Sequence, residues 1–355
     1  MTDLVSILIP AYKAEALVAE TVRSAENQTW PRKEIIIVDD GSPDRTYEVA
    51  KRFESRTVKV VRQDNGGAPA ARNAALSLAQ GDYIQWLDAD DLLHPEKISK
   101  QLQGADSGVD SRTFLTCSWG RFFFDTNRAD FVRDSLWRDL APVDWIVTKF
   151  ADNVWMNPAV WLVSRKLTEM AGPWDNRLAR SGDDDGEYVC RVVEHSDGVR
   201  FSEGAKCYYR IGTVGSLNWN METNTESQKS LVLSLKLSIE HLLRMEDSDR
   251  TRHASMNYLR AFLQYFYGCD YVLYAELRDF AVERLGSNLE APRVSWKYRP
   301  LEAVAGPRFT RKAIANWRGT KMLFRGRFEQ MLQRRSAPNF DNPEFNSGQK
   351  SVGKR

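Results

Sequence analysis

Four short apolar runs, each followed by turn-forming residues and then by a helical pattern, fill the first 95 residues. The runs are Val5–Ile9, Glu34–Val38, Val58–Val61 and Tyr83–Leu87. Strands that alternate with helices predict an α/β fold, with a mainly parallel sheet flanked by helices and joined by right-handed crossovers. In such sheets ligands bind beyond the carboxyl ends of the strands. Polar or turn-forming residues follow all four runs, so we expect a binding site along that edge.

The fourth run stops at an acidic cluster, Asp88, Asp90 and Asp91. Repulsion makes three carboxylates within four residues costly to hold together unless a cation lies among them. Their oxygens suit Mg²⁺ or Mn²⁺, which takes one or two carboxylates and completes its coordination with water and phosphate. An isolated cluster of this kind is more often a solvated turn before a helix. Four polar strand ends on one edge make the metal site the stronger hypothesis.

Two familiar phosphate-binding motifs are absent from this edge. Pro10-Ala11-Tyr12 follows the first strand in place of Gly-x-Gly-x-x-Gly, and no Gly-Lys-Ser or Gly-Lys-Thr loop occurs. These absences disfavour a dinucleotide-binding domain and a P-loop. A phosphate would instead be held by the metal, by Arg72 and by loop amides near Gly66 and Gly67. Arg72 could equally be a surface residue of its helix.

Two further side chains at this edge suit a nucleobase. Asp39 could accept a hydrogen bond from an imide N–H, and Tyr12 could supply an aromatic face. The stretch Asp39-Asp40-Gly41-Ser42 is also a good turn sequence. The residues alone leave both interpretations open.

Four longer segments contain these features in a fixed order. They are Val5–Ala14 (VSILIPAYKA), Ile35–Thr46 (IIIVDDGSPDRT), Asp64–Asn73 (DNGGAPAARN) and Gly81–Asp91 (GDYIQWLDADD). In order and spacing they resemble the nucleotide-sugar domain of the family 2 glycosyltransferases, which have the GT-A fold. The resemblance is strong over about the first 100 residues and continues more weakly to about residue 215. It implies a Rossmann-like sheet and an inverting transferase that uses a nucleotide sugar.

The resemblance implies a role for each matching residue. The nucleoside would lie against residues 10–12, Asp39 would read its base, and Arg72 would lie near the diphosphate. Asp90 would be the main ligand of Mg²⁺ or Mn²⁺, with Asp88 nearer the ribose or the sugar. The expected nucleotide-sugar-binding residues are Pro10, Ala11, Tyr12, Asp39, Asp40, Gly67, Arg72, Asp88 and Ala89, and the expected metal ligands are Asp90 and Asp88.

A second acidic cluster, Asp183–Asp185, precedes apolar residues at helical spacing. This pattern places it at a helix N-terminus, where the helix dipole stabilises carboxylates, and ordinary N-capping could explain one or two of the three. In the family an acidic pair at this position supplies the catalytic base. By resemblance the base is Asp185, with Asp184 as the nearest rival. The aromatic residue that usually follows the pair is replaced by Gly186.

Two other residues gain a role only from the resemblance. Glu187 could orient groups in the acceptor pocket. Arg210, in the expected closing strand Lys206–Arg210, could help to neutralise the diphosphate. Gly215-Ser216 resembles the flexible loop that follows this strand in the family.

Beyond residue 100 the alternation of strands and helices is lost. We expect strands at Arg112–Trp119 and Asn157–Val163, and amphipathic helices at Ser227–Met245 and His253–Tyr274 that pack on the catalytic domain or on each other. The expected organisation is a catalytic domain over 1–220, with a nucleotide-sugar-binding half (1–100) and an acceptor half (101–220), then a helical extension (221–290), a basic amphipathic segment (291–335) and a disordered tail (336–355).

Charge separates the end of the chain from the rest. Residues 291–355 contain 15 Lys and Arg against 4 Asp and Glu, a net charge of +11, whereas the first 290 residues carry −9. In Pro307–Arg335 basic residues are mixed with Phe and Trp, as in a helix that lies on an anionic membrane surface. A solvated helix with one packed face is the alternative. Nothing else in the chain supports nucleic acid binding.

The cysteines bear on the compartment. Cys117, Cys190, Cys207 and Cys269 are widely spaced and form no Cys-x-x-Cys pair. This spacing argues against a zinc site or a disulfide framework and fits a reducing cytosol. No apolar run is long enough for a signal peptide or a membrane span. We therefore expect a cytoplasmic protein, with peripheral contact at the inner face of the membrane as a further expectation.

These observations favour an inverting transferase that moves a sugar from a nucleoside diphosphate sugar to a hydroxyl of a glycan or lipid-linked acceptor. UDP is the commoner nucleotide. The metal on Asp88 and Asp90 would neutralise the departing diphosphate, and Asp185 would deprotonate the acceptor. The alternatives are a non-catalytic nucleotide-sugar-binding scaffold and a nucleotidyltransferase. The latter would be expected to carry a glycine-rich basic loop after the first strand, which Pro10–Lys13 does not resemble.

Overall fold

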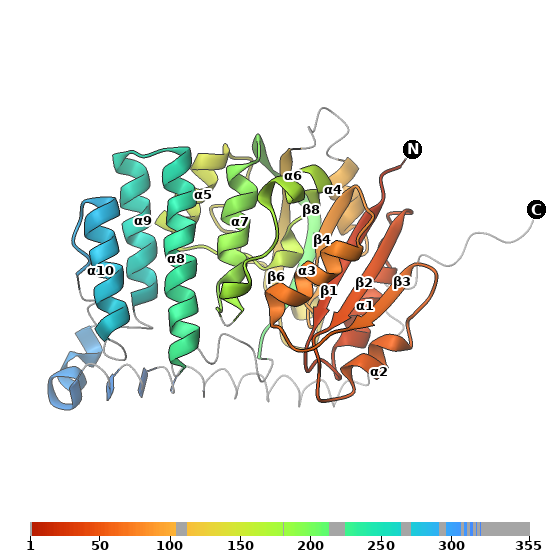
Figure 1. Ribbon diagram of the computed structural model, residues 1–355, viewed down its shortest axis with the longest axis horizontal. Helices are drawn as coiled ribbons and strands as arrows, with labels where there is room; N and C mark the ends of the chain where they lie inside the picture. The colour runs from red at the N-terminus through yellow and green to blue at the C-terminus, as the bar shows by residue number, and fades with distance from the viewer. Residues whose placement is uncertain are drawn as a thin grey trace, which may run out of the picture.

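The computed structural model describes residues 2–103, 112–179, 181–212, 224–263, 271–290 and 296–306, together with 309, 310, 313, 314, 317 and 320. Within these ranges the chain forms an α/β unit beside a row of helices (Figure 1). The predicted fold class is therefore confirmed. Most of Pro307–Arg335, the whole of 336–355 and the loop at Gly215-Ser216 lie outside the described residues.

A five-stranded sheet forms the centre of the α/β unit, in the order β3-β2-β1-β4-β7. β1 (Val5–Ala11), β2 (Lys33–Asp39), β3 (Val58–Arg62) and β4 (Tyr83–Trp86) are parallel, and β7 (Val163–Ser164) pairs antiparallel with β4. β1 and most of β2 are buried on both faces of the sheet, which explains why their sequences are continuous apolar runs. The four predicted strands are confirmed.

Three helices follow the first three strands and contribute to the core that covers the sheet. They are α1 (Val18–Glu26), α2 (Thr46–Lys51) and α3 (Ala68–Leu78). α3 begins after Gly67, whose φ of +88° favours glycine. A Cβ at this position would also lie 2.8 Å from the Cβ of Ala179, in the loop before the second acidic cluster. Gly67 therefore allows two loops at the same edge to approach each other.

A second sheet of three strands continues the unit, in the order β5-β8-β6. β6 (Thr113–Phe122) and β8 (Gly198–Arg210) are parallel, and β5 (Leu92–Leu93) pairs antiparallel with β8. Helix α4 (Lys97–Gln103) packs against β8. The pairing of β5 with β8 brings the residues after β4 against the end of β8. The strands predicted at 112–119 and 206–210 are confirmed as parts of β6 and β8.

The strand predicted at Asn157–Val163 is wrong. Pro158–Val160 forms a 3₁₀ turn, η2, and only Val163–Ser164 joins the sheet. Pro158 has no N–H and its ring fixes φ, so it starts the turn instead of extending a strand. Burial explains the apolar run, because every residue from 158 to 163 is buried.

The remaining helices lie in the second half of the chain, and Figure 1 shows α7, α8, α9 and α10 standing side by side. The helix predicted at Ser227–Met245 is confirmed as α8, whereas His253–Tyr274 spans parts of two helices, with residues 264–270 outside the described ranges. The elements are α5 (Pro142–Ala151), α6 (Arg165–Ala171), α7 (Asp184–Glu194), α8 (Thr225–Met245), α9 (Asp249–Phe262) and α10 (Tyr271–Leu285), with 3₁₀ turns η1 (Thr126–Arg128), η3 (Asn176–Leu178) and η6 (Trp296–Tyr298).

The helical extension shares one hydrophobic core with the α/β unit. Leu231, Leu235 and Leu242 of α8 are fully buried in it, at helical spacing. Phe150 of α5 stacks on Tyr258 of α9, with ring centroids 4.1 Å apart. α8 and α9 are therefore fixed relative to the α/β unit. No helix in the described part of the chain is both long enough and apolar enough to cross a membrane.

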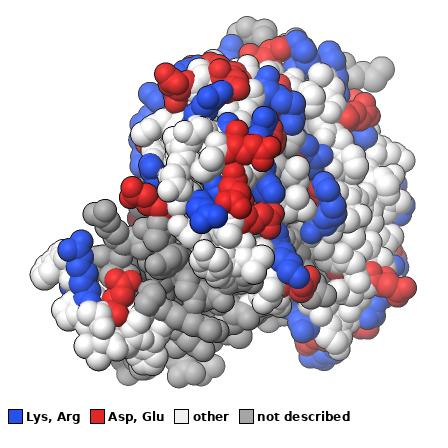
Figure 2. Space-filling view, turned by 60° about the vertical axis from the view of Figure 1, so that its left-hand side comes forward, with Lys and Arg blue, Asp and Glu red and all other residues white. Residues whose placement is uncertain are grey.

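Charges of both signs are interspersed on the face that carries the helical extension (Figure 2). Several are paired across helices, as in the ion pairs Arg284–Glu240 and Lys236–Glu276. Interspersed charges of this kind give solubility without a strong field of one sign. The positive excess noted in the sequence belongs mainly to residues outside the described ranges.

Candidate active site

One cleft of about 940 Å³ lies at the carboxyl edge of the parallel sheet. It is bordered by the ends of β1 and β4, the start of α3 and the N-terminus of α7. The structure thus brings both acidic clusters, about 95 residues apart in the sequence, to one site. The expected site residues that line it are Pro10, Ala11, Tyr12, Asp40, Gly67, Arg72, Asp88, Ala89, Asp90, Asp184 and Asp185.

Asp39 is the expected site residue that does not line this cleft. Its side chain is fully buried, where Oδ2 pairs with Arg62 Nε at 3.2 Å and accepts a hydrogen bond from Ser42 N at 3.3 Å. Its Oδ1 has no hydrogen-bond partner among the described residues. That oxygen is the part of Asp39 still able to accept a hydrogen bond from a ligand.

Asp40 organises the loop before α3. Its carboxylate accepts hydrogen bonds from Gln63 Nε2 at 2.7 Å, Gly66 N at 2.9 Å and Gly67 N at 2.8 Å. Asn65 Nδ2 donates to its backbone carbonyl at 2.9 Å. Both carboxylate oxygens are therefore engaged with the loop, so Asp40 shapes the cleft wall through the loop that it holds.

Arg72 of α3 joins the two acidic clusters. It is buried, its Nη2 donates to Asp88 Oδ1 at 3.0 Å, and its Nη1 donates to Asp184 Oδ2. Burial alone would lower the pKa of Arg72, but the carboxylates of Asp184 and Asp88 raise it above the ordinary value. The guanidinium therefore stays charged and compensates two carboxylates that would otherwise repel each other.

An aromatic stack fixes the position of this arginine. The Arg72 guanidinium lies 4.3 Å from the ring centroid of Trp174, and Trp174 stacks on Tyr188 of α7 at 3.9 Å. Trp86 of β4 contacts both rings edge-on. The last residue of β4, the start of α7 and Arg72 are thus packed as one unit beneath the cleft.

Arg210 lies behind the first acidic cluster. Its backbone N donates to Asp91 Oδ1 at 2.9 Å, its Nε donates to the Asp90 carbonyl at 2.8 Å, and its Nη2 donates to Glu20 at 2.7 Å. Arg210 does not line the cleft, so the expectation that it neutralises a diphosphate is not supported. Burial, followed by the charges of Asp90 and Asp88, raises the pKa of Asp91 well above its ordinary value.

The space left by Gly186 is filled by Asp183. A Cβ on residue 186 would lie 2.3 Å from Asp183 Oδ1. Tyr258 of α9 donates to Asp183 Oδ2 at 2.8 Å, and Ser234 of α8 donates to the Asp183 carbonyl at 2.6 Å. The Asp183 side chain makes no capping hydrogen bond to α7. Helices of the extension thus hold the residue before the expected catalytic pair.

Asp184 and Asp185 differ in their surroundings. The carboxylate of Asp184 is bound by Arg72, and burial still raises its pKa. Asp185 is partly exposed in the cleft, and no hydrogen bond to its carboxylate is found among the described residues. Burial, followed by the charges of Asp184 and Asp183, raises the pKa of Asp185 well above its ordinary value. Asp185 is the better placed of the two to accept a proton.

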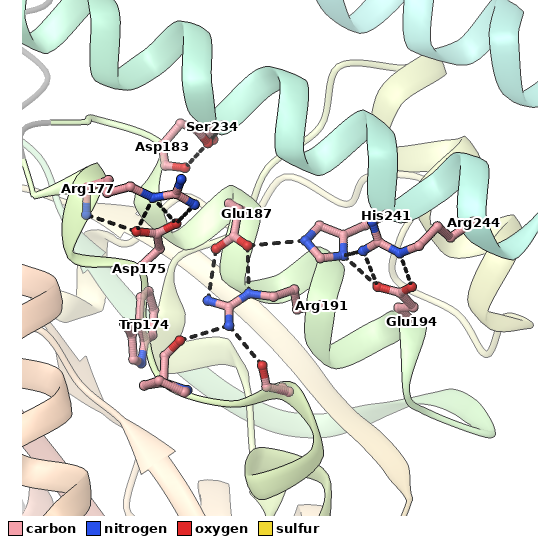
Figure 3. Close-up of polar contacts among 12 residues, drawn as sticks. Trp174, Asp175, Arg177, Asp183, Glu187, Arg191, Glu194, Ser234, His241 and Arg244 are labelled. Atoms are coloured by element: carbon pink, nitrogen blue, oxygen red, sulfur yellow. Dashed lines mark hydrogen bonds and ion pairs between the residues drawn. The ribbon is translucent and has the colours of Figure 1, made fainter. Parts of the chain in front are cut away.

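A network of charged side chains joins α7 to α8 (Figure 3). Arg191 pairs with Glu187, with Nε 2.6 Å from Oε1 and Nη2 3.0 Å from Oε2. The ring of His241 lies between Glu187 Oε1, 3.2 Å from Nε2, and Glu194 Oε2, 2.5 Å from Nδ1. Arg244 binds the same Glu194.

This network corrects the expectation for Glu187. Its side chain does not line the cleft, and it is buried between α7 and α8. It therefore holds α7 against α8 and does not face the cleft. Arg191 extends the network, because its Nη1 donates to the carbonyls of Ala171 and Pro173, both at 2.8 Å, just before Trp174.

Sequence reasoning missed several residues of the cleft wall, among them Lys149 of α5 and Tyr258 and Phe262 of α9. Lys149 is buried, with Nζ 4.9 Å from the ring centroid of Tyr258. In the sequence these residues follow the apolar spacing of helices that pack against other helices, which does not distinguish a cleft from a core. Only the contact between α5 and α9 brings them to the cleft, so no local signal could have found them.

A mainly parallel α/β sheet, with one acidic cluster at a strand end and another at the N-terminus of a facing helix, is an arrangement of the GT-A type. Residues 6–134 match the family model described as Glycosyl transferase family 2.

Relatives and solved structures agree with this classification. Glycosyltransferase GlyG of Streptococcus pneumoniae serotype 4 is 31% identical over 179 residues, covering 47% of this chain and 58% of that protein. The Escherichia coli glucosyltransferase WfaP is 43% identical over 101 residues, 28% of this chain and 40% of that protein. The chain thus spans less than two thirds of each.

The fold is also that of a solved structure. The crystal structure of residues 1–349 of Staphylococcus aureus TarS superposes with a TM-score of 0.62 at 18% identity, and covers 88% of this chain and 90% of that one. At this identity the likeness establishes the fold alone. The likeness includes the helical region as well as the α/β unit, because 88% of this chain is covered by the superposition.

Proposed function

We propose that this chain transfers a sugar from a nucleoside diphosphate sugar to an acceptor hydroxyl with inversion at the anomeric carbon. The observation that carries the proposal is that Asp88, Asp90 and Asp185 line a single cleft. Asp88 and Asp90 suit a divalent cation that would bind the diphosphate, and Asp185 suits proton abstraction. The family whose model matches residues 6–134 supports the same activity.

The first acidic cluster fits a divalent cation. Asp88 and Asp90 both line the cleft, whereas Asp91 is buried and its Oδ2 has no hydrogen-bond partner among the described residues. The described residues contain no group of three or more His, Cys, Asp or Glu side chains arranged to hold a metal. Mg²⁺ and Mn²⁺ at phosphate sites need only one or two carboxylates. We therefore assign the ion to Asp90 and Asp88, where it would stabilise negative charge on the leaving diphosphate.

Asp185 is proposed as the general base. Its carboxylate would take the proton of the acceptor hydroxyl while that oxygen bonds to the anomeric carbon. The bond between the anomeric carbon and the phosphate oxygen breaks, and its electron pair leaves with the nucleoside diphosphate. A pKa raised by burial and by Asp184 and Asp183 makes Asp185 a stronger base than an exposed aspartate.

The nucleotide is assigned to the edge formed by residues 10–12, Oδ1 of Asp39 and the loop that Asp40 holds. Among solved structures of similar fold, TarS is known in complex with UDP and with UDP-GlcNAc. A Pyrobaculum calidifontis mannosyltransferase, with a TM-score of 0.50, is known with GDP-Man and Mn²⁺. These neighbours support a nucleoside diphosphate sugar, and we take UDP as the first choice.

The acceptor is proposed to be a glycan or a lipid-linked glycan of surface polysaccharide synthesis. The full name of WfaP describes glucosyl transfer to a sugar on diphosphoundecaprenol. A lipid-linked acceptor would give the basic, aromatic segment 307–335 a function, because such a helix could hold the protein at an anionic membrane surface.

The proposal is tested by measuring nucleotide release from UDP-glucose, UDP-N-acetylglucosamine and GDP-mannose with Mn²⁺. Methyl glycosides serve as trial acceptors. We expect one donor to be turned over by the wild type and by Asp279→Asn, an exposed control on α10, but not by Asp185→Asn. Equal turnover by the wild type and Asp185→Asn would contradict the assignment of the base. Failure of the folded protein to bind any of the three nucleotide sugars would contradict the proposed activity.

A further inference from the structure

The wall of the cleft beyond Asp185 is aromatic. Trp155 from the loop after α5, Tyr209 of β8 and Phe262 of α9 line it together, and we call these three residues the aromatic wall. The donor site described above uses none of them. Because these residues line the same cleft as both acidic clusters, they indicate a binding site for a ligand other than the nucleotide.

Trp155 is the exposed member of the aromatic wall. Its relative exposure is 38%, yet its ring is held on several sides. Trp119 lies 4.9 Å from it, Tyr209 contacts it edge-on at 5.1 Å, and the Arg121 guanidinium lies over it at 5.6 Å. A large apolar ring that is both exposed and fixed is a preorganised contact surface, since little side-chain entropy remains to be lost on binding.

The backbone before Trp155 is also fixed. α5 ends with Asn153 in the left-handed region, at φ +48°, and Val154 N donates to the carbonyl of Lys149 at 3.1 Å. This is the hydrogen bond of a Schellman cap, and asparagine tolerates the conformation better than most residues. The cap determines where the chain leaves the helix, so the position of Trp155 follows from the end of α5.

Tyr209 links Trp155 to the reacting groups. Burial, followed by the charges of Asp91, Asp90, Asp88 and Asp185, raises the pKa of the Tyr209 hydroxyl. Tyr209 lines the same cleft as Asp88, Asp90 and Asp185. Trp155, in contact with the Tyr209 ring, therefore lies in the same cleft as the expected metal ligands and the expected base.

We propose that Trp155 is a stacking platform for a pyranose ring of the acceptor. This inference rests on the proposed function and adds the residue that recognises the acceptor, through the apolar face formed by the C–H groups of its sugar ring. Covering the exposed face of a fixed aromatic ring removes apolar surface from water on both partners. An open-chain acceptor such as a polyol phosphate has no flat apolar face to offer this ring.

Saturation-transfer NMR tests the stacking directly, without a donor. The probes are methyl β-D-glucoside, methyl N-acetyl-β-D-glucosaminide and glycerol 3-phosphate, added to the full chain. We expect transfer to the ring protons of at least one glycoside. Trp155→Phe should retain it, because an aromatic face remains. Trp155→Leu and Trp155→Ala should weaken the affinity about tenfold, and so should raise the acceptor KM by about the same factor.

Trp296→Leu is the matched control, because Trp296 is also exposed but does not line the cleft. It should bind the glycosides as the wild type does. Melting temperatures show that each variant is folded, and the Leu and Ala variants are independent tests of the same loss. Equal glycoside binding by the wild type and a folded Leu or Ala variant would overturn the proposal, as would binding of glycerol 3-phosphate but of no glycoside.

A UDP titration of the same samples separates this inference from the proposed function. We expect Trp155→Leu to bind UDP with unchanged affinity. Absence of UDP binding by the wild type would refute the proposed donor, while the NMR result would still decide whether Trp155 binds a sugar ring. Loss of UDP affinity in the Leu variant would place Trp155 in the donor site and overturn the acceptor assignment.

Discussion

Arg191 allows a sharp test of how α7 is held in place. Its side chain is only 15% exposed, it pairs with Glu187, and it donates to the carbonyls of Ala171 and Pro173. Arg191→Met keeps the apolar stem and removes the charge. Among the described residues, Glu187, buried between α7 and α8, would then keep His241 as its one partner.

The expected loss of stability follows from burial. Removing one partner of a buried ion pair typically costs about 3–5 kcal/mol, because the other charge stays buried and uncompensated. Arg177 offers a matched control, since it pairs with Asp175 at 2.6 Å but is 66% exposed. Exposed pairs contribute about 0–1 kcal/mol. Both arginines belong to the same region of the structure (Figure 3).

Urea unfolding at pH 7.5, followed by tryptophan fluorescence, measures both losses. We expect Arg191→Met to lower the free energy of unfolding by about 3–5 kcal/mol and Arg177→Met by less than about 1 kcal/mol. The double variant Glu187→Gln, Arg191→Met should recover much of the loss, because it removes the uncompensated carboxylate. Equal losses for Arg191→Met and Arg177→Met, or no recovery in the double variant, would refute the buried-pair argument.

Three further predictions concern the start of α7. Asp185→Asn should lower kcat by about 10²–10⁴-fold and leave the Kd for UDP unchanged; a matching loss of UDP affinity would count against a base. Because burial and the charges of Asp184 and Asp183 raise the pKa of Asp185, kcat should fall as the pH drops through a value above the usual carboxyl range. A wild-type rate that is constant down to pH 4 would contradict this. Gly186→Ala should displace the Asp183 carboxylate and lower both the melting temperature and kcat, whereas Gly198→Ala, at a site with open space, should change neither.

The local part of the fold could be predicted from the sequence. The strands of the parallel sheet and the helices between them follow from short apolar runs that are buried on both faces of the sheet. The polar residues that follow the parallel strands could be predicted to meet because these strands end at one edge, whereas the second acidic cluster was connected with them only by the resemblance. The strand expected at 157–163 failed because burial made its residues apolar, while Pro158 set the backbone.

The partners of individual charges could not be predicted. Arg72 and Arg210 were both expected to lie near the diphosphate. Arg72 instead bridges the two acidic clusters, and Arg210 lies behind the first of them. Glu187 has its partner, His241, 54 residues later on α8. Gly186 is explained by Asp183 and Tyr258, which meet only when α9 packs on α5 and α7. Such contacts depend on tertiary packing, which has no local signature.

The most direct test of the central claim is a calorimetric titration of UDP into the wild type and into Asp90→Ala, each with Mn²⁺ and with EDTA. We predict that the wild type binds UDP much more tightly with Mn²⁺ than with EDTA, and that Asp90→Ala loses this difference. UDP affinity that is the same with and without Mn²⁺, or a metal response that survives in Asp90→Ala, would contradict the assignment of the cleft as a metal-dependent donor site.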